Sequence, residues 1–125
     1  VTTKLADASL STSERTQYGN DYVALIAEIG NFVTAASFNG TNLVNAAAAD
    51  VNTVANIDGS TITLTHNNLD RATLTISATA PAQGAAVTAI AAGGTISVAE
   101  GLIATALSSF GATSLRVSVL ACTVN

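Results

Sequence analysis

The sequence contains few of the residues that carry catalytic or metal chemistry. Its 125 residues include no tryptophan, no methionine, one cysteine, one proline and one histidine, and only 10% are charged. The single cysteine, Cys122, excludes a disulfide within the chain. Only Arg116 is both basic and close to it in the sequence, so nothing marks the thiol as activated. We expect Cys122 to be a small, buried apolar residue on a helix face.

The common catalytic and binding sites are also missing from the sequence. The eight carboxylates are far apart along the chain, so no general acid–base pair is evident. A metal site needs clustered ligands, but His66 has only Asp70 near it in the sequence, and we expect a solvated loop histidine. The turn Asp58-Gly59-Ser60 lacks the calcium-loop pattern, and Gly93-Gly94 lacks the pattern that cradles phosphate. We therefore predict a protein that is not an enzyme, with no catalytic, cofactor-binding or metal site and no cofactor.

Charge and hydropathy narrow the classes of partner. The formal net charge is −4, and the four basic residues are scattered: Lys4, Arg15, Arg71 and Arg116. Nucleic-acid binding needs clustered Lys and Arg, so we expect no nucleic-acid partner. No continuous apolar run approaches the length of about 18 residues that spans a bilayer, and there is no signal-peptide pattern, so we expect no membrane partner.

One long helix is the strongest structural prediction. It begins at a capping box over Ser11–Glu14, where the serine and glutamate side chains satisfy free backbone N–H groups. It ends at Phe38-Asn39-Gly40, because asparagine and glycine tolerate the left-handed backbone that terminates helices. Val23, Ile26 and Val33 widen the apolar face of this helix. The face itself follows a coiled-coil-like seam with steps of three and four: Tyr18, Tyr22, Leu25, Ile29, Phe32 and Ala36.

A β-hairpin is predicted after this helix. Val54–Ile57 and Thr61–Thr65 flank the glycine-containing turn Asp58-Gly59-Ser60. In the second arm Ile62 and Leu64 share one face while the threonines share the other. This alternation predicts a strand with one buried side.

The segment that follows the hairpin is less regular. Residues 72–78 repeat the alternation, with Leu74 and Ile76 inward, and predict a third strand with an exposed threonine-rich face. Residues 85–92 fit a short helix or a strand equally well. Gly93-Gly94 predicts a hinge or turn.

A second long helix is predicted from Thr95 onward. Ser97 to Glu100 has the pattern of another capping box. Apolar or small residues again recur in steps of four and three: Ile103, Leu107, Phe110, Ser114, Val117, Ala121 and Val124. We expect this seam to pack within the subunit.

The predicted fold class is mainly α with a small β region (α+β). We expect an elongated bundle of two long helices plus a helix end, with a small antiparallel sheet inserted between them. At this length it is a single domain over residues 1–125. Its parts are an N-terminal helical part at 1–44, a β region at 51–80 and a C-terminal helix at 95–125.

Several ordered motifs are shared with a known family. They are Leu5-Ala6, the Ser-rich link Ser11–Arg15 with its acidic–Arg pair, Glu28-Ile29, and Phe38-Asn39-Gly40 followed by Leu43. In this order and spacing the chain resembles bacterial flagellin, in the core domain of the filament. Phe110-Gly111-Ala112 and Arg116 resemble a run of the flagellin C-terminal core helix, where Leu115 replaces the usual Asn.

The resemblance implies a structural subunit of the bacterial flagellar filament, the helical propeller used for motility. It implies self-association with other flagellin subunits, an export chaperone and a cap protein for the parent chain, and an extracellular location. Export would use the flagellar secretion apparatus without a cleaved signal peptide. We expect the sequence to be a fragment that lacks the terminal polymerisation helices and is monomeric by itself.

Two alternative functions stay open. The first is the hook–filament junction protein, whose start is similar to flagellin. The second is a cell-surface adhesin or glycan-binding module that presents the threonine-rich sheet. Asn39-Gly40-Thr41 fits a glycosylation sequon formally, but turn chemistry explains it better. We do not predict recognition by a Toll-like immune receptor, because Gly19, Asn20 and Asp21 replace bulkier residues of that epitope.

Overall fold

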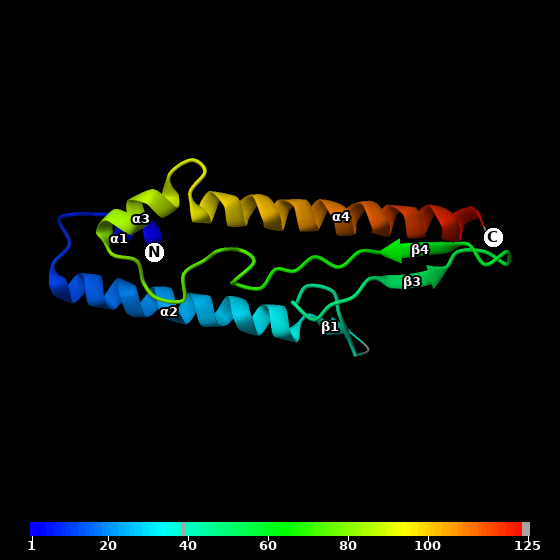
Figure 1. Cartoon of the computed structure of the whole chain (residues 1–125), viewed down its shortest axis with the longest axis horizontal. Coiled ribbons are helices and arrows are strands. Elements are labelled where there is room, and N and C mark those ends of the chain that lie inside the picture. Colours follow the sequence, from blue (N-terminus) through cyan, green and yellow to red (C-terminus); the bar gives the residue numbers. More distant parts are fainter. Residues whose placement is uncertain (39, 124–125) are drawn as a thin grey trace.

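The computed structural model describes residues 1–38 and 40–123. Figure 1 shows an elongated molecule in which two long helices, α2 (Thr12–Ala35) and α4 (Thr95–Thr123), run along the long axis in the same direction. Two shorter helices, α1 (Thr2–Leu5) and α3 (Gln83–Ile90), lie together at one end. Four short strands complete the fold: β1 (Ser37–Phe38), β2 (Thr41–Asn42), β3 (Val51–Val54) and β4 (Thr61–Leu64). The predicted fold class, mainly α with a small β region, is confirmed.

The start of α2 follows from its sequence. The Ser11 hydroxyl accepts a hydrogen bond from the Glu14 N–H at 3.3 Å, and the Glu14 carboxylate accepts from the Ser11 N–H at 3.0 Å. This reciprocal pair is the predicted capping box. Arg15, in the first turn, donates to the carbonyl oxygens of Leu5 and Asp7, both at 2.9 Å, and so joins the end of α1 to α2.

The end of α2 differs from the prediction. The helix stops at Ala35, because the Asn42 side chain donates to the Val33 carbonyl at 2.7 Å and takes one of the free carbonyls of the last turn. β1 and β2 then pair as a small antiparallel hairpin, with Gly40 at φ +79 in the connection. Of the predicted stop signal, Asn39 lies outside the described residues.

The β3–β4 hairpin is present, but its first strand begins earlier than predicted. Val51 pairs with Leu64 and Val54 with Thr61, so residues 55–60 form the loop. The prediction had placed Ala55–Ile57 in the strand. It was wrong because the Asn56 side chain accepts hydrogen bonds from two loop N–H groups and holds a longer turn. In β4 the isoleucine and leucine are half-buried and the threonines exposed, as predicted.

The predicted third strand over residues 72–78 is wrong. Residues 71–75 form a turn, closed by hydrogen bonds from the Leu74 N–H to the Asp70 carbonyl and from the Ile76 N–H to the Arg71 carbonyl. The Arg71 guanidinium also donates to the Ile76 carbonyl at 2.9 Å. Leu74 and Ile76 are nevertheless both buried, as the alternation predicted, because the turn points them the same way.

The C-terminal part resolves the open choice at residues 85–92 as a helix, α3. Gly93 adopts φ +75 in the turn that follows, and a Cβ on Gly94 would lie 2.3 Å from the Thr88 carbonyl oxygen. The two glycines therefore permit the sharp turn. The predicted capping box at Ser97 and Glu100 is wrong, because α4 already begins at Thr95 and both residues lie inside the helix.

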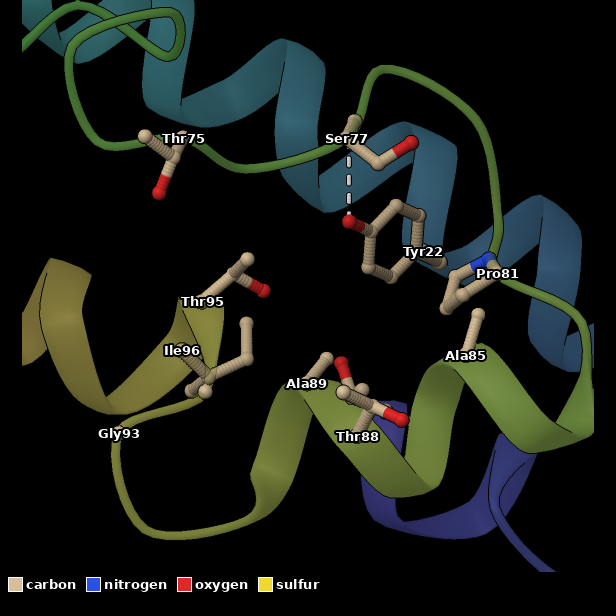
Figure 2. A pocket seen from close by; sticks show the side chains of 12 residues that line it. Tyr22, Thr75, Ser77, Pro81, Ala85, Thr88, Ala89, Gly93, Thr95 and Ile96 are labelled. Atoms are coloured by element: carbon tan, nitrogen blue, oxygen red, sulfur yellow. Dashed lines mark hydrogen bonds between the residues drawn. The ribbon is translucent and has the colours of Figure 1, made fainter.

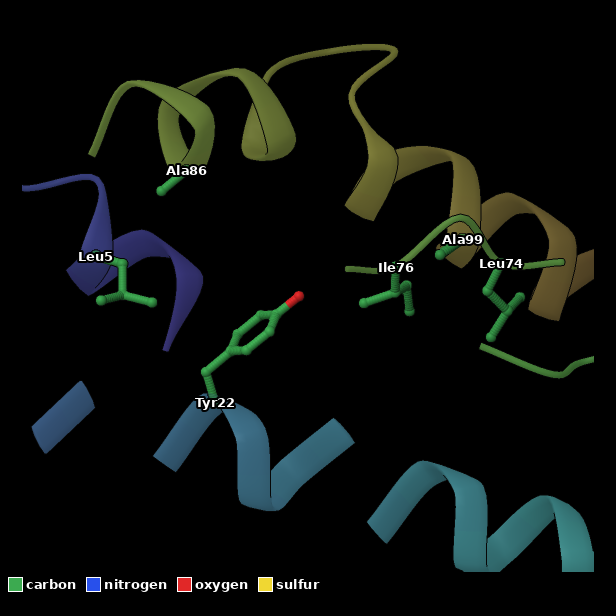
Figure 3. Close-up of a cluster of buried hydrophobic side chains, with 6 residues drawn as sticks. All are labelled: Leu5, Tyr22, Leu74, Ile76, Ala86 and Ala99. Atoms are coloured by element: carbon green, nitrogen blue, oxygen red, sulfur yellow. The ribbon is translucent and has the colours of Figure 1, made fainter. Parts of the chain in front are cut away.

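The main buried cluster lies toward the α1–α3 end of the molecule (Figure 3), and Val33 and Ala106 are buried outside it. It is a single cluster of six side chains, with Tyr22 of α2 between the short helices and the segment after the turn: Leu5, Tyr22, Leu74, Ile76, Ala86 and Ala99. Leu5 and Leu74 are the largest fully buried side chains, each 1% exposed. Arg15 and the Gln83 side chain, which donates to the Ala6 carbonyl at 2.9 Å, tie the helices around this cluster.

The two predicted seams are only partly correct. On α2 the covered face contains Tyr18, Tyr22 and Ile29 of the predicted seam, together with Ile26 and Val33, which were correctly predicted to widen it. The other predicted residues are exposed: Val23, Leu25, Phe32 and Ala36. Among the α4 residues whose side chains are described, the buried positions are alanines, Ala99 and Ala106, and the predicted Ile103, Leu107 and Val117 are exposed. The predicted Ala121 and Val124 lie outside that part. The seams were predicted for two helices in direct contact, whereas the chain after β4 lies between the two long helices in Figure 1. On α4 the covered residues are the small Ala99 and Ala106.

Candidate assembly surface

Large apolar side chains are exposed on both long helices. Phe32 of α2 is 66% exposed and Leu107 of α4 is 72% exposed. The other exposed large hydrophobic residues on these helices are Val23, Leu25, Val98, Leu102, Ile103, Leu115, Val117 and Val119. A helix that is apolar on most of its circumference is normally covered on most of it. Exposed apolar faces of this size are typical of protein–protein interaction surfaces.

Charge is nearly absent from α4. Of its 29 residues only Glu100 and Arg116 are charged. Depletion of charge is the compositional mark of the centre of a protein interface. The outer face of α2 is less uniform, because Asp21 and Glu28 lie on it with Leu25 and Phe32.

The total surface of the chain is large for its mass. The chain exposes 7998 Å², whereas a compact monomer of the same mass exposes about 6,100 Å². The surplus of about 1,900 Å² compares with about 800 Å² that a standard interface removes from each partner. The surplus therefore equals roughly two interfaces per chain.

A hollow of about 600 Å³ lies beside the core cluster. Figure 2 shows Tyr22, Ser77 and Thr75 on one side of it, and Ala89, Thr95 and Ile96 on the other. The Tyr22 hydroxyl donates to the Ser77 carbonyl at 3.0 Å, and burial raises the pKa of that phenol. The hollow has no Asp, Glu, Lys, Arg or His in its lining. It suits an uncharged occupant.

A second groove runs between the β3–β4 hairpin and α4. It is lined by Ile62 and Leu64 of β4, Phe110 and Val117 of α4, and neighbouring hydroxyl residues. β4 contacts α4 along it. The half-buried side chains of β4 pack against α4 and hold the hairpin on the helix.

His66 has a partner that the sequence did not suggest. Its Nδ1 lies 2.8 Å from the Asp50 carboxylate, and its N–H donates to the same oxygen at 2.9 Å. These bonds hold the pKa of Asp50 below its usual value, the ring contributing most. Asp70, the neighbour noted in the sequence, instead accepts from the Ala46 N–H at 3.0 Å. The Asp50–His66 pair joins the two strands at the base of the hairpin.

The structure places the remaining candidate residues as follows. Asp58-Gly59-Ser60 lies in the hairpin loop, with Gly59 at φ +82. Cys122 lies in α4, but its side chain is outside the described residues, so its predicted burial is not tested. Within residues 1–38 and 40–123, no group of three or more His, Cys, Asp or Glu side chains is arranged to hold a metal.

The sequence has no continuous apolar run long enough to span a bilayer, but the average composition of one stretch reaches that level. Among the described residues, the stretch Gln83–Val119, which includes α3, the turn at Gly93-Gly94 and most of α4, is long and apolar enough by length and composition. The expectation counted continuous runs, whereas alanine, valine, isoleucine and leucine outweigh the interspersed serines and threonines on average. Only 11% of the apolar window is buried within the chain. A helix covered by another protein chain has the same property, so this finding does not assign it to a bilayer.

No protein-family model matches the sequence, and no curated protein matches it.

Proposed function

We propose that this chain is the core part of a self-assembling structural subunit, a flagellin of the bacterial flagellar filament. The observation that carries the proposal is the exposed, nearly uncharged apolar surface of α4 together with Leu25 and Phe32 of α2. A surface of this kind is costly in a monomer and useful in a polymer. The motif resemblance around Ser11–Leu43 supplies the family, and the architecture of long helices with a hairpin is compatible with it.

Several further features belong to the same proposal. The partners are other subunits of the same kind, with an export chaperone and a filament cap for the natural chain. The location is extracellular, reached through the flagellar export apparatus. No catalytic role is proposed. The alternatives are a hook–filament junction protein and a surface adhesin, which would carry the same chain at the filament base or over the cell envelope.

Adjacent residues on α2 offer a matched test. Phe32 is exposed on the outer face of α2 with Leu25, whereas the neighbouring Asn31 is an exposed polar residue. Phe32→Glu should slow filament assembly of the natural chain at least tenfold, because a charge would have to be desolvated in the interface. Asn31→Glu adds the same charge next door and should assemble normally. Assembly is followed by negative-stain electron microscopy, and circular dichroism checks that both variants keep their helices.

If the two variants assembled at equal rates, the exposed face of α2 around Phe32 would not be part of an assembly interface. Labelling with an antibody against this chain separates the alternatives. Label along whole filaments supports a flagellin, label at the filament base a junction protein, and patches over the cell envelope an adhesin.

A further inference from the structure

The β3–β4 hairpin ends in a hydrogen-bonded loop that exposes one large apolar side chain, Ile57. Ile57 is 102% exposed, so its side chain contacts nothing in its own chain. The loop that carries it is held by a 2.6 Å hydrogen bond from the Ala55 N–H to the Ser60 carbonyl. The Asn56 side chain also accepts from the Asp58 and Ser60 N–H groups, each at 3.1 Å. These hydrogen bonds order the loop backbone that carries Ile57, which lowers the entropic cost of ordering that backbone on binding.

The uncharged hollow lies toward the other end of the molecule. Its lining includes Ala85 and Ala89 of α3 and Ile96 of α4. Small residues leave room for an apolar side chain to enter. Thr75, on the opposite wall, has φ +57, which is costly for a β-branched residue. The fold thus maintains a strained turn on the wall of this hollow.

Position decides which molecule the tip can reach. Figure 1 shows α1 and α3, which flank the hollow, at one end of the long axis and the tip of the β3–β4 hairpin at the other. The Ile57 side chain of one chain therefore cannot enter the hollow of the same chain, but it can enter that of a neighbour. A contact between two different patches of identical chains is heterologous, and it propagates unless the rotation closes a ring.

We propose that Ile57 at the hairpin tip of one subunit inserts into the hollow between α2, α3 and α4 of the next copy of this chain. The inference rests on the proposed function, since it describes how successive subunits are joined. The proposed contact places the apolar side chain of Ile57 in a hollow that is lined by uncharged residues.

Area and charge both favour a second copy as the occupant. The surplus surface, taken over the whole chain, equals roughly two interfaces and is enough for contacts with other copies. The charges beside the two patches are also opposite. Asp58 follows Ile57 at the tip, and Arg71 binds the carbonyl of Ile76, between the lining residues Thr75 and Ser77. Opposite charges at the rim of an apolar contact favour its orientation.

Disulfide trapping between two copies tests the contact directly. In a Cys122→Ser background, one preparation carries Ile57→Cys and a second carries Ala89→Cys, inside the hollow. Both variants are made in the natural chain, mixed under the conditions of filament assembly and oxidised with copper phenanthroline, and the linked dimer is measured on a non-reducing gel. The matched control pairs Ile57→Cys with Val87→Cys, because Val87 is exposed on the same helix and is not part of the lining.

We expect the 57–89 disulfide to form at least tenfold faster than the 57–87 disulfide. Equal rates would overturn the contact between Ile57 and the hollow. The proposed function would survive that result if Phe32→Glu still blocked assembly where Asn31→Glu did not. If the two α2 variants behaved alike while the 57–89 disulfide formed selectively, the head-to-tail contact would stand and the helix surface would not.

Discussion

The two ends of the molecule are built differently. At the α1–α3 end, segments distant in sequence meet: Tyr22 bonds to Ser77 and Gln83 to Ala6, and six side chains form the core cluster. At the hairpin end the bonds are more local, such as the Thr63 hydroxyl to Asn52 at 2.6 Å across the strand pair. The apolar side chains there are half-buried or exposed. One end therefore holds the chain folded, while the other presents surface.

The largest expected effect tests this contrast with two leucines. Leu74→Ala in the core should lower the free energy of unfolding by about 2–5 kcal/mol, through lost burial and a residual cavity. Leu115→Ala, at a site 65% exposed on α4, should change it by less than about 0.5 kcal/mol. Urea titration followed by circular dichroism measures both. Similar losses in the two variants would mean that the ends are not energetically distinct.

A smaller effect tests the buried tyrosine. Tyr22→Phe removes the hydrogen bond to the Ser77 carbonyl and should cost about 1 kcal/mol, since that carbonyl is left without its partner. Tyr18→Phe is the control, because its ring is half-buried and its hydroxyl makes no hydrogen bond within the described residues. Tyr18→Phe should be neutral by the same titration. If both variants lost equal stability, the Tyr22–Ser77 hydrogen bond would not contribute specifically to the free energy of unfolding.

The smallest effect concerns acid sensitivity at the hairpin end. Hydrogen bonds from His66 lower the pKa of Asp50 below 3.8, so their stabilising effect is present above that pH and is lost as the pH falls through the lowered value. Asp50→Asn should therefore reduce the loss of stability between about pH 5 and about pH 2. The pair is exposed, so the change should be small.

The readout is the free energy of unfolding at a series of pH values. Asp58→Asn serves as the control, because that carboxylate accepts no hydrogen bond within the described part of the chain. Asp7 and Glu14 also have pKa values lowered by hydrogen bonds from Ser9 and Ser11, so part of the acid sensitivity should survive in Asp50→Asn. Identical pH profiles for wild type and Asp50→Asn would contradict the role of the pair.

Local chemistry explains what the sequence could predict. The Ser11–Glu14 capping box and the alternation in β4 depend on neighbours three or two positions apart, and both are present. The glycine at position 59 correctly indicated the hairpin. The fold class followed from these elements. None of them depends on how distant segments meet.

Tertiary contacts explain what the sequence could not predict. Leu74 and Ile76 alternate as in a strand, but Arg71 holds the backbone in a turn through the Ile76 carbonyl. On α4, periodicity selected the large residues Ile103 and Leu107, whereas the alanines face the interior. No local sequence pattern predicts the hollow, because its walls come from α2, the segment after β4, α3 and α4.

The small core has a consequence for the heat capacity of unfolding. The steepness of a denaturant transition and the curvature of stability with temperature both scale with the surface that unfolding newly exposes. A chain that already exposes 7998 Å² has less left to expose than a compact monomer of its mass. Alone, it should melt over a broad temperature range. In the proposed polymer the same sequence should melt more sharply, because subunit contacts would add surface that unfolding newly exposes.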